Sequence, residues 1–444
     1  MHNIEMSSVP RGPQIDRRTF LRWTAAAGAV VALAPVLEAC SPNSAPASPG
    51  GSAGGGIVTF GGDSNDQSYQ AAAGTVFSAF TAQTGIAVKP TYTDNQTWQT
   101  NMDRYLQGNP DDVMNWACGY RMRYYAGKGL LTPLDEVWAT IGTNYNAGFT
   151  ELAKADDGHP YIVPVNTQPW GVFYRKSLWA QHGYQEPTTG DEMRALCQQM
   201  QKDGITPIGF ANKDGWEAFG FFDYANFRTN GYDFHIKLLN NEAAWDSPEM
   251  RATYDTINSF REYWQPNFAG RTGDEACADL ANKKVGMFLY GSYVGQAMTP
   301  DVQADLDFFT FPEINPAYDR DTIDAPGNGI MLTKSPKNID GARQLAAFWG
   351  TPAAQAIYVK SDPTSIADVA NADTSAYTDL QKKMVQVVAD AKHVAQFTDR
   401  DTRPDFVSTI LVPAYQQWLA NPSQVDSILK SIDSQRAALF ATEG

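Results

Sequence analysis

From Ile57 onward, short apolar runs alternate with segments of helical periodicity, and this alternation restricts the fold more than any other feature of the chain. The run at residues 57–60 is followed by a helical pattern over residues 68–83 and by a second apolar run at residues 86–92. A short apolar run bounded by turn residues is typical of a buried strand, whereas apolar residues at i, i+3, i+4 and i+7 indicate a helix. The order strand, helix, strand predicts an α/β protein with a largely parallel sheet.

The same alternation continues through most of the chain. We expect further strands or extended segments at residues 111–116, 161–165, 172–174, 208–211, 285–290 and 330–333. Thr189 and Glu192 form a capping box, which predicts a helix that runs through Met200. Thr351 is the expected cap of another helix, whose first residue is Pro352. The C-terminal third is predicted to be helical, with no strand of comparable strength.

Size and composition exclude several classes of protein. The chain has 444 residues, which is enough for two or more hydrophobic cores. It carries 34 basic and 49 acidic residues, a formal charge of −15, which argues against nucleic acid as a partner. The five His and four Cys show no CxxC or HxxxH spacing, so the sequence predicts no metal site and no cofactor. Cys197 shares a helical face with Met193 and Met200, which predicts a buried thiol.

Residues 1–40 are interpreted as a processing segment and not as part of the fold. Arg17 and Arg18 precede an apolar run over residues 23–37, which is shorter than the ~20 residues that cross a bilayer. The segment resembles a twin-arginine export signal joined to a lipobox that ends at Cys40. The resemblance implies export out of the cytoplasm and a lipid on Cys40 that anchors the protein to the cell membrane.

Residues 41–56 contain only Ser, Pro, Asn, Ala and Gly. An uncharged segment without apolar periodicity cannot bury a hydrophobic face, so we expect a flexible tether there.

Several of the predicted strands end in small or polar residues. Gly61, Gly62 and Asp63 follow the first strand, and Gly291 and Ser292 follow the strand at residues 285–290. In open α/β sheets ligands bind outside the carboxyl ends of the strands. These loops are therefore the first candidates for a binding site.

Motifs in a characteristic order connect the chain to a known family. They are residues 109–113 with Trp116, 129–134, 161–164, 173–178, 186–192, 286–288 with 291–293, and 335–338. In this order the sequence resembles the family 1 extracellular solute-binding proteins, which are the sugar-binding receptors of ABC importers and include the maltose-binding protein.

The resemblance implies an α/β fold of two lobes, the type II periplasmic-binding-protein-like fold. Each lobe is a sheet flanked by helices, and the ligand is enclosed in the cleft between the lobes by hinge closure. Matching positions place the hinges near Val165, Asp324 and Asp362. The expected first lobe is residues 57–165 with 325–361, and the expected second lobe is residues 166–324 with 362–444.

A neutral sugar presents an apolar face and a rim of hydroxyls, so its receptor needs flat aromatic rings and polar groups at their edges. Strand ends and family positions together select Asp63, Asn65, Trp116, Gln168, Trp170, Asp214, Trp216, Tyr293, Asn328 and Arg403. Asn328 lies in a small-residue loop that a ligand can approach closely. Arg403 belongs to a polar cluster with Asp399, Arg400 and Asp401. The pair Asp214 and Trp216 is the strongest candidate, and we expect it to hold one sugar unit.

We therefore expect a monomeric, non-enzymatic receptor that captures a neutral mono- or oligosaccharide and delivers it to a membrane permease. Two alternatives stay open. A receptor for a polyol phosphate or another anion would need Arg or Lys at strand ends, and only Arg400 and Arg403 are available. A secreted glycoside hydrolase would need two carboxyl groups about 5 to 9.5 Å apart with different pKa values, and no sequence fingerprint singles out such a pair.

Overall fold

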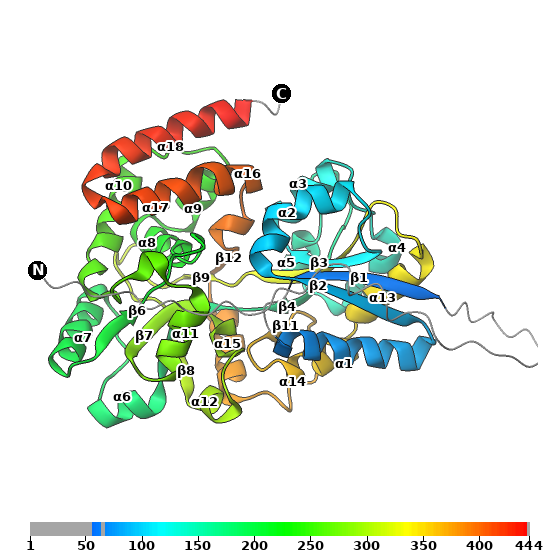
Figure 1. Ribbon diagram of the computed structural model, residues 1–444, viewed down its shortest axis with the longest axis horizontal. Coiled ribbons are helices and arrows are strands. Elements are labelled where there is room, and N and C mark those ends of the chain that lie inside the picture. The colour runs from blue at the N-terminus through cyan, green and yellow to red at the C-terminus, as the bar shows by residue number, and fades with distance from the viewer. Residues whose placement is uncertain (1–55, 64–66, 442–444) are drawn as a thin grey trace, which may run out of the picture. The chain divides into compact units, whose positions relative to one another are not determined.

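The computed structural model of the protein describes residues 56–63 and 67–441 (Figure 1). The predicted signal segment with Cys40, the tether up to residue 55, and Asn65 lie outside the described residues. Within the described residues no helix is both long and apolar enough to span a membrane. The strands of the described chain are β1 Ile57–Asp63, β2 Ala87–Thr93, β3 Val113–Ala117, β4 Val163–Thr167, β5 Trp170–Arg175, β6 Thr206–Gly209, β7 Val285–Gly291, β8 Leu306–Phe309, β9 Thr322–Asp324, β10 Gly327–Leu332, β11 Ile366–Ala367 and β12 His393–Ala395.

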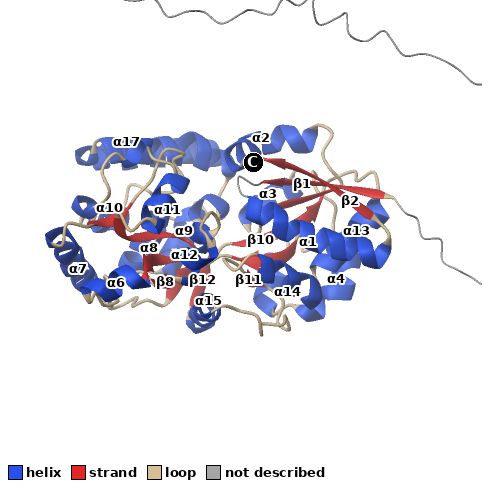
Figure 2. Ribbon diagram, turned by 60° about the horizontal axis from the view of Figure 1, so that its bottom comes forward, coloured by secondary structure: helices blue, strands red, loops and turns tan. Residues whose placement is uncertain are grey.

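A six-stranded sheet in the order β11-β4-β10-β3-β1-β2 forms the centre of what we call the first lobe. Figure 2 shows α2 and α3 on one face of this sheet and α1, α13 and α14 on the other. Apolar side chains fill both faces, in separate core clusters. The helices of the first lobe are α1 Gln67–Thr84, α2 Asn95–Gln107, α3 Tyr120–Gly127, α4 Asp135–Ile141, α5 Ala147–Leu152, α13 Ile339–Trp349 and α14 Pro352–Ser361.

A four-stranded sheet in the order β6-β7-β5-β8 forms the centre of the second lobe. The short strands β9 and β12 pair with each other beside it. The helices that we assign to the second lobe are α6 Lys176–His182, α7 Gly190–Lys202, α8 Phe219–Asn230, α9 Tyr232–Leu239, α10 Pro248–Asn258, α11 Gly273–Ala281, α12 Pro300–Ala304, α15 Asp379–Asp390, α16 Pro404–Phe406, α17 Val412–Ala420 and α18 Val425–Phe440. The two-lobed α/β architecture predicted from the resemblance is confirmed.

Both large sheets are mixed, so the prediction of a largely parallel sheet was wrong. In the first lobe β1 pairs in parallel with β2 and β3, whereas β10 runs antiparallel to both β3 and β4. In the second lobe only β6 and β7 are parallel, and β5 runs antiparallel to β7 and β8. A strand that is buried on both faces is a continuous apolar run whether its neighbours are parallel or antiparallel. Its direction relative to those neighbours therefore cannot be predicted from the run alone.

The chain passes between the lobes at short segments. Gln168 and Pro169 connect β4 of the first sheet to β5 of the second, and Ala325 and Pro326 connect β9 to β10. The Gln168 N–H donates to the Pro326 carbonyl at 3.3 Å, so these two crossings lie side by side. Strand β11 pairs with β4 although it follows the crossing expected near Asp362, because the chain adds one more strand to the first sheet before it leaves.

Several local predictions are confirmed. Thr189 and Glu192 form the capping box of α7, and Thr351 caps α14 with Pro352 as its first residue. Cys197 is fully buried. The short strands β8, β9, β11 and β12 were missed in the C-terminal third, because two to four residues are too few to show a clear alternating pattern.

Candidate functional site

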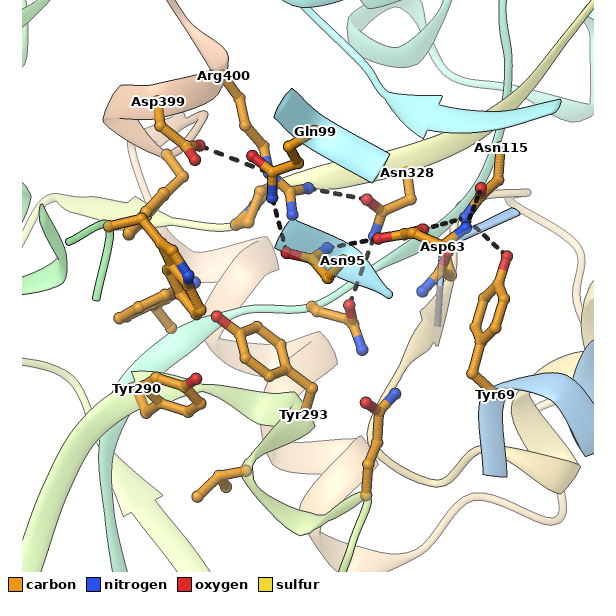
Figure 3. A pocket seen from close by; sticks show the side chains of 18 of the residues that line it. Asp63, Tyr69, Asn95, Gln99, Asn115, Tyr290, Tyr293, Asn328, Asp399 and Arg400 are labelled. Atoms are coloured by element: carbon orange, nitrogen blue, oxygen red, sulfur yellow. Dashed lines mark hydrogen bonds and ion pairs between the residues drawn. The ribbon is translucent and has the colours of Figure 1, made fainter. Parts of the chain in front are cut away.

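A cavity of about 280 Å³ lies where the strand ends of the first lobe face the second lobe (Figure 3). We call it the main cavity. One side, the polar wall, consists of Asp63, Tyr69, Asn95, Gln99 and Asn115 from the first lobe.

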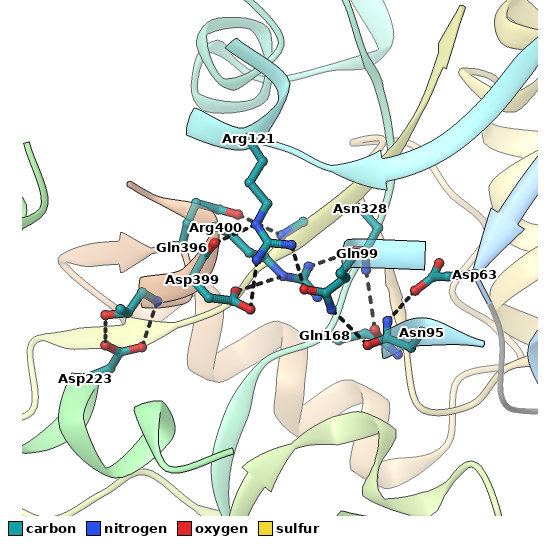
Figure 4. A network of polar contacts seen from close by, with 12 residues as sticks. Asp63, Asn95, Gln99, Arg121, Gln168, Asp223, Asn328, Gln396, Asp399 and Arg400 are labelled. Atoms are coloured by element: carbon teal, nitrogen blue, oxygen red, sulfur yellow. Dashed lines mark hydrogen bonds and ion pairs between the residues drawn. The ribbon is translucent and has the colours of Figure 1, made fainter. Parts of the chain in front are cut away.

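A chain of hydrogen bonds orders the polar wall (Figure 4). Nη1 of Arg121, in α3, donates to Oε1 of Gln99 at 2.8 Å. Gln99 Nε2 donates to Asn95 Oδ1 at 2.8 Å, and Asn95 Nδ2 donates to Asp63 Oδ2 at 2.5 Å. A guanidinium can only donate and an ionised carboxylate can only accept, so the two ends of the chain determine the orientation of both amides.

Asn115, in the middle of β3, completes the surroundings of Asp63. Its Nδ2 donates to Asp63 Oδ1 at 2.7 Å, and its Oδ1 accepts from the Asp63 backbone N–H at 3.1 Å. The same Nδ2 also donates to the hydroxyl of Tyr69 at 2.8 Å. Burial raises the pKa of Tyr69 well above its usual value, so its hydroxyl stays neutral. Donors therefore converge on Asp63, which is held as an acceptor at the edge of the cavity.

A buried ion pair connects the polar wall to the second lobe. Arg121 Nη2 lies 3.1 Å from Asp399 Oδ2, and Arg121 Nε donates to the Asp399 carbonyl at 2.6 Å. Asp399 belongs to the turn η6, Thr398–Arg400, and the Thr398 N–H donates to Asp223 of α8 at 3.0 Å. Burial lowers the pKa of Arg121, and the charge of Asp399 opposes this shift.

Arg400 places a cation at the same cavity. Its Nη1 donates to Oδ1 of Asn328, on β10, at 2.8 Å, and Asn328 Nδ2 donates to Oε1 of Gln168 at 3.4 Å. Gln168 lies in the first crossing segment, so these contacts join the hinge region to the cavity lining.

The opposite side of the main cavity, the aromatic wall, consists of Trp170, Trp216, Tyr290, Tyr293 and Phe397. Trp170 is fully buried and stacks on Phe397, with ring centroids 4.5 Å apart. Trp216 is only partly buried, and its ring meets that of Trp170 edge-on at 6.5 Å. Trp170 therefore supports the wall from behind, whereas Trp216 offers a face to a ligand.

Comparison with known proteins identifies the family. The family model of bacterial extracellular solute-binding proteins matches residues 62–356, which is more than half of the chain. The chain belongs to this family. A model of the twin-arginine translocation signal matches residues 14–34 of this solute-binding protein, so both matches support export to the extracytoplasmic space.

Solved structures share the fold of this solute-binding protein. A bacterial solute receptor described as having an exclusive preference for β-D-galactopyranose is 39% identical, with a TM-score of 0.86, over 87% of this chain and all of that chain. A chitin oligosaccharide binding protein has a TM-score of 0.78 at 17% identity, over 87% of this chain and all of that chain. At this low identity the likeness concerns the fold alone.

Curated relatives match over shorter segments. A probable sugar-binding periplasmic protein of Rhizobium meliloti is 28% identical over 286 residues, which is 62% of this chain and 66% of the relative. An uncharacterised ABC transporter extracellular-binding protein of Pyrococcus horikoshii is 25% identical over 294 residues, 65% of either chain. The solute-binding protein thus spans just under two thirds of the length of these relatives.

Six of the ten candidate residues lie together in the main cavity of this solute-binding protein. They are Asp63, Gln168, Trp170, Trp216, Tyr293 and Asn328. Asp214 lines an adjoining, smaller cavity, and Asn65 lies outside the described residues.

Two candidates lie elsewhere in the solute-binding protein. Trp116 is buried in the core beneath α2 and α3, because successive side chains of a strand alternate between faces and Asn115 takes the cavity side. Arg403 pairs with Asp405 at 2.8 Å, and Arg400 of the same polar cluster reaches the cavity instead. The expectation that Trp116 and Arg403 line the cavity was therefore wrong.

Several lining residues of the solute-binding protein were not predicted. Asn95 and Gln99 are one helical turn apart on α2, which could have indicated a shared polar face. Asn115 could have been found from the alternation within β3. Tyr69 and Asp274 carry no comparable local signal, because they reach the cavity only through the packing of their helices.

Proposed function

We propose that this protein is the substrate-binding component of an ABC importer and captures a neutral sugar in the main cavity. The observation that carries this proposal is the pairing of the two walls. One wall presents oriented hydrogen-bonding groups, and the other presents aromatic faces, which together match the hydroxyl rim and the apolar face of a pyranose. The 39% identical receptor with a preference for β-D-galactopyranose supports the same class of ligand.

The charges at the cavity favour a neutral ligand over an anion. Asp63, Asp274 and Asp399 line the main cavity, whereas Arg400 is the cation among its described lining residues. Arg400 already donates to Asn328. An anionic sugar would meet more negative than positive charge, so binding would be weakened.

We infer that capture and delivery use the two lobes and the membrane anchor together. The protein acts as a monomer, and its two lobes close on the sugar about the crossing segments. The first lobe includes β11, Ile366–Ala367, in addition to residues 57–167 and 325–361. The lipid on Cys40 holds the protein beside the permease. A solute-binding receptor binds its ligand and hands it over without breaking a bond. We therefore expect the sugar to be released unchanged.

The binding proposal is tested by calorimetry on the exported protein with D-galactose, D-glucose, D-mannose and D-xylose. We expect at least one sugar to bind and Asp63→Ala to weaken it about 100-fold or more, because the variant loses the acceptor on which the amides of Asn95 and Asn115 converge. The surface variant Asp103→Ala is the matched control in the same lobe. Failure of all four sugars to bind would refute the proposal. Release of p-nitrophenol from the p-nitrophenyl glycosides of these sugars during overnight incubation would show a glycoside hydrolase.

The anchor proposal has its own test. Cys40→Ala is expected to abolish partitioning into the detergent phase when the protein is expressed in a host with twin-arginine export. Unchanged partitioning would show that Cys40 carries no lipid.

A further inference from the structure

Three acidic side chains are buried together where the chain crosses from β9 to β10. Asp324 is the last residue of β9, Asp223 lies on α8, and Asp399 belongs to the turn η6 (Figure 4). Asp223 and Asp324 are fully buried, and Asp399 is nearly so. A buried carboxylate is costly unless its charge is balanced and its oxygens accept hydrogen bonds.

Asp223 and Asp324, which we call the acid pair, differ in their hydrogen bonds. The Thr398 N–H donates to Asp223 Oδ2 at 3.0 Å, and the Thr398 hydroxyl donates to Asp223 Oδ1. Apart from Asp223, no described residue donates a hydrogen bond to the Asp324 carboxyl. The two side chains of the acid pair are hydrogen-bonded to each other. Two ionised carboxylates have no hydrogen to donate, so this bond requires a proton on one of them.

The charges around the acid pair also call for one proton. Nη2 of Arg121 lies 3.1 Å from Asp399 Oδ2, and Nε of Arg400 lies 3.9 Å from Asp399 Oδ1. Three buried carboxyls thus share two guanidinium groups. A single proton on the acid pair leaves this cluster without net charge. Burial, which disfavours the ionised form, raises the pKa of both carboxyls of the pair in the same sense.

Other titratable groups that face the acid pair do not replace this proton. His235 Nε2, on α9, lies 3.9 Å from Asp223 Oδ1, but burial lowers the pKa of His235 to about 3 and keeps the ring neutral. Arg228 of α8 donates to the carbonyls of Phe311 and Thr322. Burial raises the pKa of three nearby tyrosine hydroxyls and keeps them neutral; they are those of Tyr224, Tyr293 and Tyr415.

Both members of the acid pair connect directly to the main cavity. Asp223 holds the turn η6 through Thr398, and the next two residues of that turn, Asp399 and Arg400, line the cavity. Asp324 is followed by the crossing segment Ala325 and Pro326, and Pro326 also lines the cavity. The shared proton therefore joins two segments that shape the ligand site.

We propose that the acid pair is a proton site that couples sugar binding to pH. With the proton in place, the two carboxyls hold η6 against the crossing segment. When the proton is lost, two carboxylates repel each other at the same place, the crossing segment moves away from η6, and the sugar is bound less tightly. Linkage is reciprocal, so sugar binding should in turn favour proton uptake by the pair. The inference rests on the proposed function, which supplies the sugar.

The first test measures affinity at two pH values. The sugar that binds most tightly in the four-sugar panel is titrated by calorimetry at pH 6.5 and pH 9.5 into the parent and Asp324→Asn. We expect the Kd of the parent to rise about fivefold or more, the lower end of typical coupling between sites. An amide at position 324 donates to Asp223 at every pH, so the Kd of Asp324→Asn should change less than twofold. An unchanged Kd in the parent, or an equal rise in Asp324→Asn, would overturn the inference.

Glu217→Gln is the matched control, because it removes another buried carboxyl whose pKa is raised. Glu217 does not belong to the acid pair, so this variant should keep the pH dependence of the parent. A flat profile in Glu217→Gln would assign the effect to Glu217 and overturn the inference.

Two further measurements separate this inference from the proposed function. Calorimetry of the parent alone at pH 8, in two buffers of different ionisation enthalpy, should show net proton uptake when the sugar binds; no uptake would count against the coupling. Infrared spectroscopy without sugar should show a protonated carboxyl at pH 6.5 that disappears by pH 9.5 and is missing from Asp324→Asn. If no sugar binds, the proposed function is refuted, whereas an infrared band unaffected by Asp324→Asn refutes the shared proton.

Discussion

The polar and aromatic walls of the main cavity are held in place by different physical means. The polar wall is a chain of hydrogen bonds that runs from Arg121 to Asp63. The aromatic wall is a set of packed rings in which Trp170 stacks on Phe397. Hydrogen bonds are directional, whereas apolar contacts depend mainly on buried area. We therefore expect the polar wall to decide which sugar binds and the aromatic wall to decide how tightly it binds.

The largest expected effect comes from breaking the polar wall at its buried end. Arg121→Met removes the nearer of two cations from the buried Asp399 carboxylate and leaves Arg400, whose Nε lies 3.9 Å from Asp399 Oδ1. This change should lower the free energy of unfolding by about 3–5 kcal/mol. Gln99 also loses its donor, so the variant should discriminate poorly between the sugars of the panel. Urea unfolding and calorimetry measure the two effects.

Arg121→Lys is the control for this prediction. Lysine keeps the positive charge beside Asp399 but cannot reach Gln99 with a second, rigidly held donor. It should recover much of the stability and little of the discrimination between sugars. Equal stability of Arg121→Met and the parent would contradict the assigned role of the ion pair.

The free energy of unfolding is expected to depend on pH through the buried carboxyl group of Glu217. Glu217 follows Trp216 in sequence, and burial raises its pKa from 4.5 to about 7. Because the folded state disfavours the charged form, the free energy of unfolding should fall as the pH rises from 4.5 through 7. Glu217→Gln should remove about 3 kcal/mol of that loss between pH 4.5 and 8, measured by urea unfolding at both values.

Other buried carboxyls make a matched comparison necessary. Burial also raises the pKa of Asp223, to about 8, and that of Asp324, so the parent should lose stability for more than one reason. Only the difference between Glu217→Gln and the parent reports on Glu217. Parallel pH profiles of the two proteins would refute the prediction.

The aromatic wall itself is tested at Trp216. Trp216→Ala should weaken sugar binding by roughly 2 to 3 kcal/mol, or about 30-fold to 150-fold in Kd, with little change in melting temperature. Trp170→Ala is the contrasting variant, because Trp170 is fully buried and should lower the melting temperature instead. If Trp216→Ala melts well below the parent while its folded fraction binds normally, Trp216 is a core residue.

The smallest expected effect is that of salt. A neutral sugar bound by hydrogen bonds and ring faces should change its Kd less than about twofold between low salt and 0.5 M salt, since screening acts on charge pairing. A tenfold loss of affinity over the same range would instead support an anionic ligand held by Arg400.

The contrast between the walls also explains which site residues could be predicted. Aromatic residues at strand ends and after glycine turns, such as Trp216 and Tyr293, are visible in the sequence because their type and local position are informative. The polar wall was largely missed, because Asn95 and Gln99 resemble ordinary surface residues of a helix. The prediction of Trp116 was one residue away from Asn115, and one residue in a strand is enough to reverse the face.

The sequence by itself determined the α/β alternation, the capped helices and the export signal at residues 14–34, because each depends on residues that are close together in the chain. Only the tertiary structure decided the direction of the strands and which residues line the main cavity. Asp63 meets Asn115 across 52 positions, and Arg121 meets Asp399 across 278. Such contacts depend on how whole sheets and helices pack, and no local pattern of residue types records that packing.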